Sequence, residues 1–246
     1  MFKLISAILI ASSISLCACT ATNYDKDLVP DVAPENLYNT AKTAMASGNY
    51  AVARQYLEAL DTRYPFGALS EQVQLDLIYT YYKNRDPEMT SAQINRYIRL
   101  NPTSEYMDYI LYMKGLNHIQ KRSSIVQDWL GLDRSQKDPT EYLAALNTFK
   151  QLINTYPDSP YVHDAYQRCI YIRNELAKRE FAIASYYKER GALLSSIRHC
   201  QTIIYAYRGT EYIEPALALM KDNYKELGLD EASINSDTVY KANYNN

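Results

Sequence analysis

Small and bulky side chains recur along the chain in one fixed spacing, four times over. A small residue is followed by a bulky one four positions later, by a second bulky one three positions after that, and by a chain break after five more. The four instances are Ala53-Leu57-Leu60-Pro65, Thr90-Ile94-Tyr97-Pro102, Ala145-Phe149-Leu152-Pro157 and Ser196-Cys200-Ile203-Arg208, where Arg replaces the closing Pro. Steps of four and three keep side chains on one face of an α-helix, and Pro ends the helix because it has no backbone N–H. We therefore predict four helices that pack through this stripe.

A second helix is expected upstream of the stripe. Gly48 and Gly191 lie five residues before the small position, where the left-handed turn that ends a helix favours Gly. Twelve residues before it come Ala41, Ile78 and Ala184, mostly small residues that suit a contact between helices. The two-helix unit resembles the tetratricopeptide repeat, a hairpin of about 34 residues that buries its apolar face only by stacking on other copies. The predicted fold is all-α, an α-solenoid of about five tetratricopeptide-like helical hairpins.

Two intervals between chain breaks are longer than one repeat, so extra material is expected there. In the first, a helical pattern over residues 104–118 is followed by a non-repeat insertion at 119–137, which contains Trp129, before Asp138 begins the next helix. The second excess falls on residues 161–190, which contain no Gly or Pro. This stretch predicts one long bridging helix, with two shorter helices as the alternative.

The N-terminal residues have the pattern of a secretory signal with a lipid attachment site. Lys3 precedes an apolar run too short to span a bilayer, and the run ends in Leu16-Cys17-Ala18-Cys19. This ending resembles the bacterial lipobox, in which the Cys that follows a small residue is lipidated, so Cys19 is the predicted anchor. The alternatives are lipidation of Cys17 and ordinary cleavage after Ala.

The residue after the predicted anchor bears on localisation. The residue that follows Cys19 is Thr20 and not Asp. By the sorting rule of bacterial lipoproteins, this predicts a protein that is lipid-anchored in the outer membrane and faces the periplasm. Several acyl chains on one Cys hold a protein at a lipid surface without a transmembrane helix. The predicted organisation is a signal peptide at 1–18, a lipidated flexible tether at 19–34, repeats one to three at 35–157, repeats four and five at 158–237, and a polar tail at 238–246.

Composition narrows the class of protein. Hydrophobic residues make up 47% of the 246 positions, which excludes wholesale disorder, and 26 basic against 28 acidic residues leave no positive excess to attract nucleic acid. Only 7 Gly and 9 Pro are present, too few for the turns of a large β-sandwich. Tyr occurs 25 times beside 4 Phe and 1 Trp, and its flat ring with a polar tip suits both packing and recognition.

An ordered set of short segments over residues 64–192 is similar to the signature segments of the BamD family, outer-membrane lipoproteins of the β-barrel assembly machinery. The segments are Tyr64-Pro65-Phe66-Gly67, residues 72–79, Arg99-Leu100-Asn101-Pro102, Asp133-Arg134-Ser135 with Asp138-Pro139, and Glu189-Arg190-Gly191-Ala192. The resemblance implies a non-enzymatic scaffold without cofactors. Its N-terminal repeats would bind unfolded outer-membrane proteins and its C-terminal repeats the last POTRA domain of BamA, alongside other Bam lipoproteins.

The resemblance places a peptide site in the N-terminal repeats, where aromatic residues cluster. An aromatic floor could carry an extended apolar peptide while the hydroxyls bond its backbone. The residues concerned are Tyr64, Phe66, Tyr79, Tyr81 and Tyr82. The alternative is that these rings pack between helices.

The BamA-type partner is expected at a hairpin tip of the fourth repeat, with Arg190, Gly191 and Arg198. Arg can pair with a partner carboxylate through two hydrogen bonds and also contributes flat apolar area. The alternatives are a solvated charged face or an internal pair with Glu180 or Glu189.

No pattern of catalytic or metal-binding residues is present. His118, His163 and His199 have no companion ligands at zinc spacing, and neither a phosphate-binding loop nor a nucleophile motif occurs. Cys169 and Cys200 either form a disulfide in an oxidising periplasm or remain two buried thiols.

Two other classes of protein fit parts of the pattern. A tetratricopeptide lipoprotein that acts as a pilotin for secretin or type IV pilus assembly would share the anchor and the solenoid. A helical peptidoglycan hydrolase would need a catalytic Glu followed by Ser, and the chain contains no Glu-Ser dipeptide.

Overall fold

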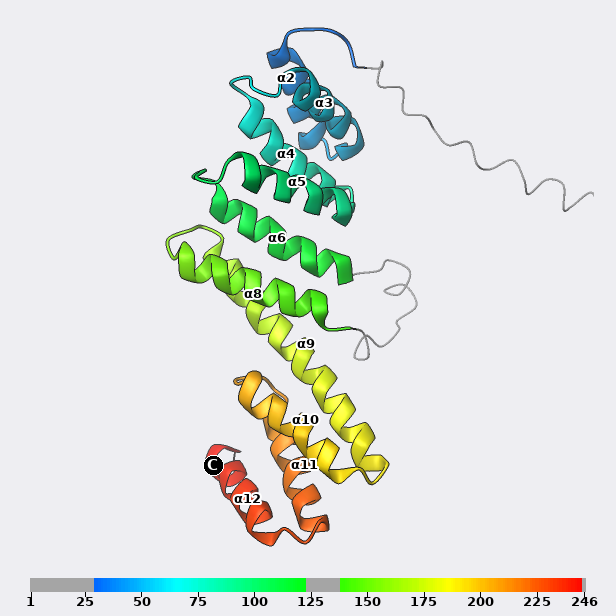
Figure 1. Ribbon diagram of the computed structural model, residues 1–246, viewed down its shortest axis with the longest axis vertical. Helices are drawn as coiled ribbons and strands as arrows, with labels where there is room; N and C mark the ends of the chain where they lie inside the picture. Colours follow the sequence, from blue (N-terminus) through cyan, green and yellow to red (C-terminus); the bar gives the residue numbers. More distant parts are fainter. Residues whose placement is uncertain (1–28, 123–137, 245–246) are drawn as a thin grey trace, which may run out of the picture. The chain divides into compact units, whose positions relative to one another are not determined.

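The computed structural model describes residues 29–122 and 138–244, and every regular element in these two ranges is an α-helix (Figure 1). Successive helices pair into five hairpins, which confirms the predicted all-α fold of tetratricopeptide-like hairpins. The pairs are α2 (Pro34–Ala46) with α3 (Tyr50–Arg63), α4 (Ser70–Lys83) with α5 (Pro87–Leu100), α6 (Met107–Arg122) with α8 (Thr140–Thr155), α9 (Val162–Glu189) with α10 (Leu193–Ala206), and α11 (Ile213–Glu226) with α12 (Asp230–Tyr244).

The chain forms two compact units, which meet in sequence at Ser70. The first unit contains α2 and α3. The second begins at Glu71 and contains the helices from α4 to α12.

The stripe predicted from the sequence is the buried face of α3, α5, α8 and α10. All twelve small and bulky residues of the four instances are at most 2% exposed. The helices end one residue before their cap residues, which are Tyr64, Asn101, Tyr156 and Tyr207. At each cap the backbone N–H donates to the carbonyl four residues earlier. Helix α10 ends at the same position as the others without a Pro, because Gly209 adopts a left-handed φ of 78° and Thr210 donates its hydroxyl hydrogen bond to the Tyr207 carbonyl.

Helix α9 joins two cores of the second unit and is one continuous helix of 28 residues, as predicted. Its first half, with Ile172 and Leu176, belongs to the core formed with α4, α5, α6 and α8. Its second half, with Ala177 and Ala184, packs with α10 and α11. Figure 1 shows α9 running from α8 to α10.

The two cysteines of the described residues remain free thiols. Cys169 lies in the first of these cores and Cys200 in the second, and both are buried. Burial raises the pKa of both thiols, that of Cys200 to about 12, so neither is a reactive thiolate at neutral pH. Of the two alternatives, the structure has the buried thiols.

The close approach of α6 and α8 depends on Gly115, a position that no sequence pattern singled out. A Cβ atom placed on Gly115 would lie 2.5 Å from the Phe149 ring, well inside van der Waals contact. The ring itself is fully buried and lies against Tyr112. Glycine at this position lets the Phe149 side chain lie directly on the α6 backbone.

Both predicted ends of the folded body need correction. The predicted tether at 19–34 is too long, because Val29 is buried and the Arg63 guanidinium donates hydrogen bonds to the carbonyls of Val29 (2.9 Å) and Pro30 (3.0 Å). The predicted tail at 238–246 is wrong up to Tyr244, because α12 continues to that residue. No Gly or Pro stops this helix, and Tyr240 donates a hydrogen bond to Glu214 on α11.

Several predictions lie outside the described residues. They concern the signal peptide at 1–18, the anchor Cys19 and most of the insertion, including Trp129. The insertion was predicted from residue 119, whereas α6 continues through Arg122. Within the ranges 29–122 and 138–244, no helix combines the length and the apolar character needed to cross a bilayer.

A hydrogen-bonded cluster of one carboxylate and two hydroxyls, between α4, α5 and the turn before α6, predicts a pH-dependent stability. Glu71 accepts hydrogen bonds from the hydroxyls of Tyr97 and Ser104, both at 2.7 Å, and these bonds hold the pKa of Glu71 below its ordinary value. The ionised carboxylate therefore adds stability above its unfolded pKa of about 4.3, and this contribution is lost as the pH falls through the lower folded-state pKa.

We expect Glu71→Gln to lower the free energy of unfolding at pH 7 by about 1 kcal/mol. It should also flatten the loss of stability between about pH 5 and 3. Urea unfolding at several pH values measures both effects, with Glu231→Gln as a control because Glu231 is exposed at the start of α12. Equal pH profiles for wild type and Glu71→Gln would show that the cluster does not act in this way.

Candidate functional site

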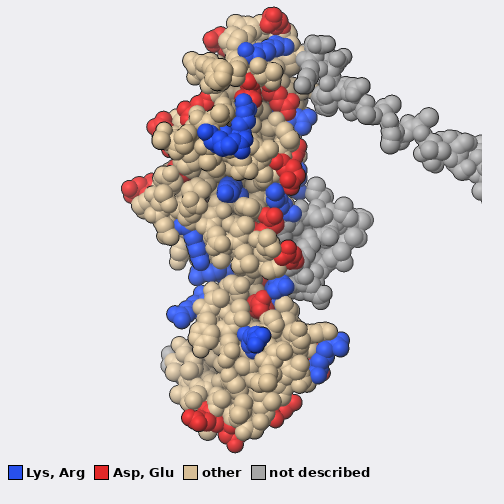
Figure 2. Space-filling model, viewed as in Figure 1, with Lys and Arg blue, Asp and Glu red and all other residues tan. Residues whose placement is uncertain are grey.

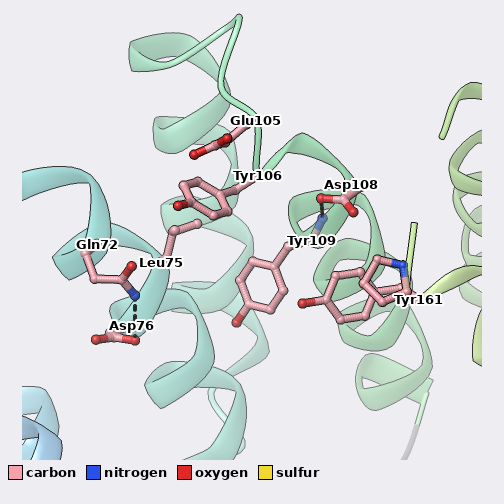
Figure 3. Close-up of a pocket in the computed structure, with 9 residues that line it drawn as sticks. Gln72, Leu75, Asp76, Glu105, Tyr106, Asp108, Tyr109 and Tyr161 are labelled. Atoms are coloured by element: carbon pink, nitrogen blue, oxygen red, sulfur yellow. Dashed lines mark hydrogen bonds between the residues drawn. The ribbon is translucent and has the colours of Figure 1, made fainter. Parts of the chain in front are cut away.

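The second unit contains a cavity of about 490 Å³, which we call the tyrosine pocket (Figure 3). It is bordered by α4, by the turn between α5 and α6, by the start of α6, and by the turn before α9. The lining residues are Gln72, Leu75, Asp76, Glu105, Tyr106, Asp108, Tyr109, Pro160 and Tyr161. Three segments far apart in sequence thus contribute to one concave surface, as ligand pockets commonly require.

The aromatic side of the pocket is held rigidly. The rings of Tyr109 and Tyr161 have centroids 5.8 Å apart, and Tyr161 stacks on Tyr112 at 4.8 Å. The Tyr112 hydroxyl donates to Asp164 (2.7 Å), which also accepts from Arg168. Although burial opposes it, these two bonds hold the pKa of Asp164 below its ordinary value, so the carboxylate remains charged and fixes the ring.

The polar side of the pocket carries negative charge. Asp76, Glu105 and Asp108 all line it, whereas none of the described lining residues is Lys or Arg. Asp76 is only 7% exposed and accepts a hydrogen bond from Gln72. Burial raises the pKa of Tyr109, so its hydroxyl remains a protonated donor at neutral pH. The pocket therefore combines aromatic faces with acceptors and an excess of carboxylates.

The five aromatic residues predicted to bind peptide are not brought together in one compact unit. Tyr64 and Phe66 lie in the first unit, in the turn after α3, where Phe66 is 95% exposed. Tyr79 and Tyr82 lie on α4 in the second unit, half-buried against its core. Tyr81 is 4% exposed, so for this ring the structure has the packing between helices that was the alternative to a peptide contact.

The burial of Tyr81 has a simple physical reason. Helix α4 is buried around most of its circumference, from Val73 to Ile78 and again at Thr80 and Tyr81. Positions 79 and 82 are three residues apart and share one side of the helix, whereas position 81 lies toward the opposite side, so the three rings cannot all face one groove.

The pocket tyrosines were missed from the sequence, although a signal was present. Tyr106, Tyr109 and Tyr112 recur every three residues, which places them close together along one side at the start of α6. The contribution of Tyr161 had no local signal, because it depends on how the turn before α9 packs against α6.

Two of the predicted partner residues, Arg190 and Gly191, form an exposed turn between α9 and α10. The Arg190 guanidinium lies 4.4 Å from the centroid of the Tyr186 ring, and Gly191 adopts the left-handed φ of 70° that the turn requires. Arg198 is exposed one turn into α10. Glu180, considered as an internal partner for these arginines, instead accepts from Arg179 (2.9 Å) and pairs with His199 (2.6 Å).

Helix α10 presents two large apolar side chains beside Arg198. Leu194 is 69% exposed and Tyr205 is 70% exposed. Because positions 194, 198 and 205 are spaced by four and seven residues, they share one side of the helix. We call these three residues the α10 face. Figure 2 shows that much of the surface over α10 to α12 is uncharged in this view.

A shallow cavity of about 370 Å³ adjoins the α10 face at Tyr205. Its apolar walls come from Ile213 and Leu217 on α11 and from Val239 on α12. A partner side chain could therefore be inserted next to an exposed aromatic ring, which is the arrangement of many interface anchors.

Comparison with known proteins identifies relatives along almost the whole chain. Residues 30–239 match the family YfiO, described as outer membrane lipoprotein. Three relatives are named outer membrane protein assembly factor BamD. The relative from Vibrio cholerae is 46% identical over 84% of this chain and 86% of its own length; that from Pasteurella multocida is 34% identical over 92% and 86%; and that from Neisseria meningitidis serogroup A is 31% identical over 99% and 92%. The chain belongs to the BamD family of outer membrane protein assembly factors.

Proposed function

We propose that this protein is a non-enzymatic scaffold of β-barrel assembly, anchored in the outer membrane and facing the periplasm. It binds unfolded outer-membrane proteins and brings them to BamA, alongside other Bam lipoproteins. The observation that carries this proposal is the match of residues 30–239 to a family whose members are named for outer-membrane protein assembly. These names also favour assembly over the pilotin alternative.

The substrate-binding role is supported by aromatic surfaces in both units. The tyrosine pocket supplies ring faces and hydroxyl donors for an extended chain, and Phe66 supplies a fully exposed ring in the turn after α3. Unfolded β-barrel segments expose alternating apolar side chains and unpaired backbone groups, which such surfaces complement. Tyr64, Tyr79 and Tyr82 remain proposed contacts at their exposed edges.

The partner-binding role is assigned to the tip of α9 and α10 and to the α10 face. Arg190 and Arg198 offer charged forks, whereas Leu194 and Tyr205 offer exposed apolar area on the same helix pair. Arginine beside aromatic residues is the composition typical of interface hot spots. We therefore assign the POTRA domain of BamA to this surface.

The anchor is proposed to be a set of acyl chains on Cys19. Because Arg63 holds the backbone at Val29 and Pro30, only about nine residues separate the lipidated Cys from the folded unit. Their greatest reach is about 30 Å, so the first unit would be held close to the membrane surface.

Co-purification from detergent extracts tests both ends of the proposal. The wild-type protein should retain BamA, and Cys19→Ala should move the protein from the membrane to the soluble fraction, because the predicted anchor is its lipid. Extracts without BamA would remove the partner assignment. A Cys19→Ala protein that stays equally membrane-bound would remove the anchor. Depletion of the protein should reduce many outer-membrane barrels, whereas selective loss of pili would support the pilotin alternative.

A further inference from the structure

We propose that the tyrosine pocket receives a positively charged side chain, Lys or Arg, from an extended segment of an unfolded outer-membrane protein. This inference rests on the proposed function. It adds the kind of substrate side chain that the second unit of the protein would select. It concerns the pocket between α4, α6 and the turn before α9, which no sequence pattern had identified.

The charge of the pocket lining favours a cation. The carboxylates of Asp76, Glu105 and Asp108 line one cavity, and its described lining contains no basic residue. Asp76 is 7% exposed and accepts a hydrogen bond from Gln72, which also lines the pocket. An incoming carboxylate, including a free chain terminus, would meet three carboxylates of like charge in this lining. A cation meets opposite charge there.

The aromatic rings of the pocket also favour a cation, independently of the carboxylates. Figure 3 shows the Tyr109 ring between Asp76 and the Tyr161 ring in this view, with the Tyr106 ring near Leu75 and Glu105. The faces of aromatic rings attract ammonium and guanidinium groups. The same faces cover the apolar stem of a Lys or Arg side chain, whose charged end then lies at the carboxylates.

The size and rigidity of the pocket suit one long side chain. A cavity of about 490 Å³ is within the range of ligand pockets and is large enough for one long side chain with part of its backbone. The Tyr161 ring is already fixed by its stack on Tyr112, whose hydroxyl donates to Asp164, and it contacts the Tyr109 ring. Little ordering is therefore needed when a side chain enters.

A pair of capped, fluorescein-labelled peptides tests the proposal. Both contain alternating Tyr and Thr, and one central residue is either Lys or the uncharged norleucine. Fluorescence anisotropy with the full mature protein in detergent measures each dissociation constant. We expect the Lys peptide to bind about tenfold more tightly at low salt, which corresponds to about 1.4 kcal/mol, and the ratio to shrink at high salt.

Variants of the pocket should remove this discrimination without unfolding the protein. The double variant Glu105→Gln with Asp108→Asn keeps the size of both side chains and changes neither core, so the ratio should fall close to one. Asp76→Asn provides an independent second variant. Glu231→Gln, an exposed acid on α12 outside the pocket, is the control and should keep the wild-type ratio.

Several outcomes would overturn the inference. They are equal affinities for the two peptides, no measurable binding of either, a ratio that survives neutralisation of the pocket, and tighter binding of a peptide that ends in a free carboxylate. Binding of a urea-denatured β-barrel protein is measured in parallel. If the barrel protein binds but the peptides do not discriminate, only the charge preference fails. If the barrel protein does not bind, the proposed substrate role itself fails.

Discussion

Gly115→Ala is expected to lower the free energy of unfolding by about 1–3 kcal/mol, even though Ala is the better helix former. The new methyl group would lie 2.5 Å from the Phe149 ring, and because that ring is fully buried, the ring or a helix backbone must shift within the core. Helix propensity returns at most about 1 kcal/mol of this loss. In a chain of this size each 1 kcal/mol lowers the melting temperature by roughly 2–4 °C. Urea and thermal unfolding followed by circular dichroism measure the change.

A double-mutant cycle with Phe149→Leu separates overpacking from other effects of the Gly115 substitution. Phe149→Leu alone leaves a cavity and is destabilising, but it makes space for the methyl group. The double variant should therefore be more stable than the sum of the two single changes predicts, by about 0.5–3 kcal/mol. Additive effects, or a Gly115→Ala protein as stable as wild type, would mean that α6 and α8 can separate without cost.

Gly115 and Phe149 also show which packing features of this fold sequence patterns can predict and which they cannot. The stripe through Ala145, Phe149 and Leu152 identified a buried face correctly, because periodicity alone places those residues on one side of a helix. Gly115 could not be found in this way. Its role depends on which neighbouring helix approaches, and a solitary Gly inside a helix otherwise only indicates weaker helix propensity.

The ends of the folded body illustrate a second limit. Val29 and Pro30 have no helical pattern, so a flexible tether was the natural interpretation of that segment. They are nevertheless fixed by the side chain of Arg63, which lies more than thirty residues later in the chain. Such long-range hydrogen bonds cannot be predicted from local composition. The full length of α12, in contrast, could have been predicted, because no Gly or Pro occurs before Tyr244 in this helix.

The candidate sites divide in the same way. Arg190 and Gly191 were placed at a hairpin tip from the turn signal of Gly, and the structure has them there. The place of Tyr81 in a peptide site rests on the family resemblance and on its neighbours on one helix, whereas its burial between helices depends on how α4 packs. The tyrosine pocket needed three separated segments to meet, so only the spacing of Tyr106 and Tyr109 was visible beforehand.

Arg198→Glu is expected to weaken BamA binding about 30-fold or more while the fold is retained. The residue is exposed on α10, between Leu194 and Tyr205, so it makes few contacts within the protein itself. Reversing the charge removes a bidentate donor and brings a carboxylate against the acidic group that it would pair with on the partner. Loss of one interface anchor costs about 2 kcal/mol or more, which corresponds to this factor in the dissociation constant.

Apolar area on the same face should matter independently of charge. Tyr205→Ala removes a ring that is 70% exposed and that borders the cavity against α11 and α12, so it should weaken binding with little salt dependence.

The matched control for Arg198→Glu is Arg99→Glu, which makes the same charge reversal at an exposed position of α5. Calorimetric titration with the purified POTRA domains of BamA measures each affinity, and melting curves verify folding. If Arg198→Glu and Tyr205→Ala both bind like Arg99→Glu, the partner docks elsewhere, because neither the charge nor the ring of the α10 face would then contribute to the affinity.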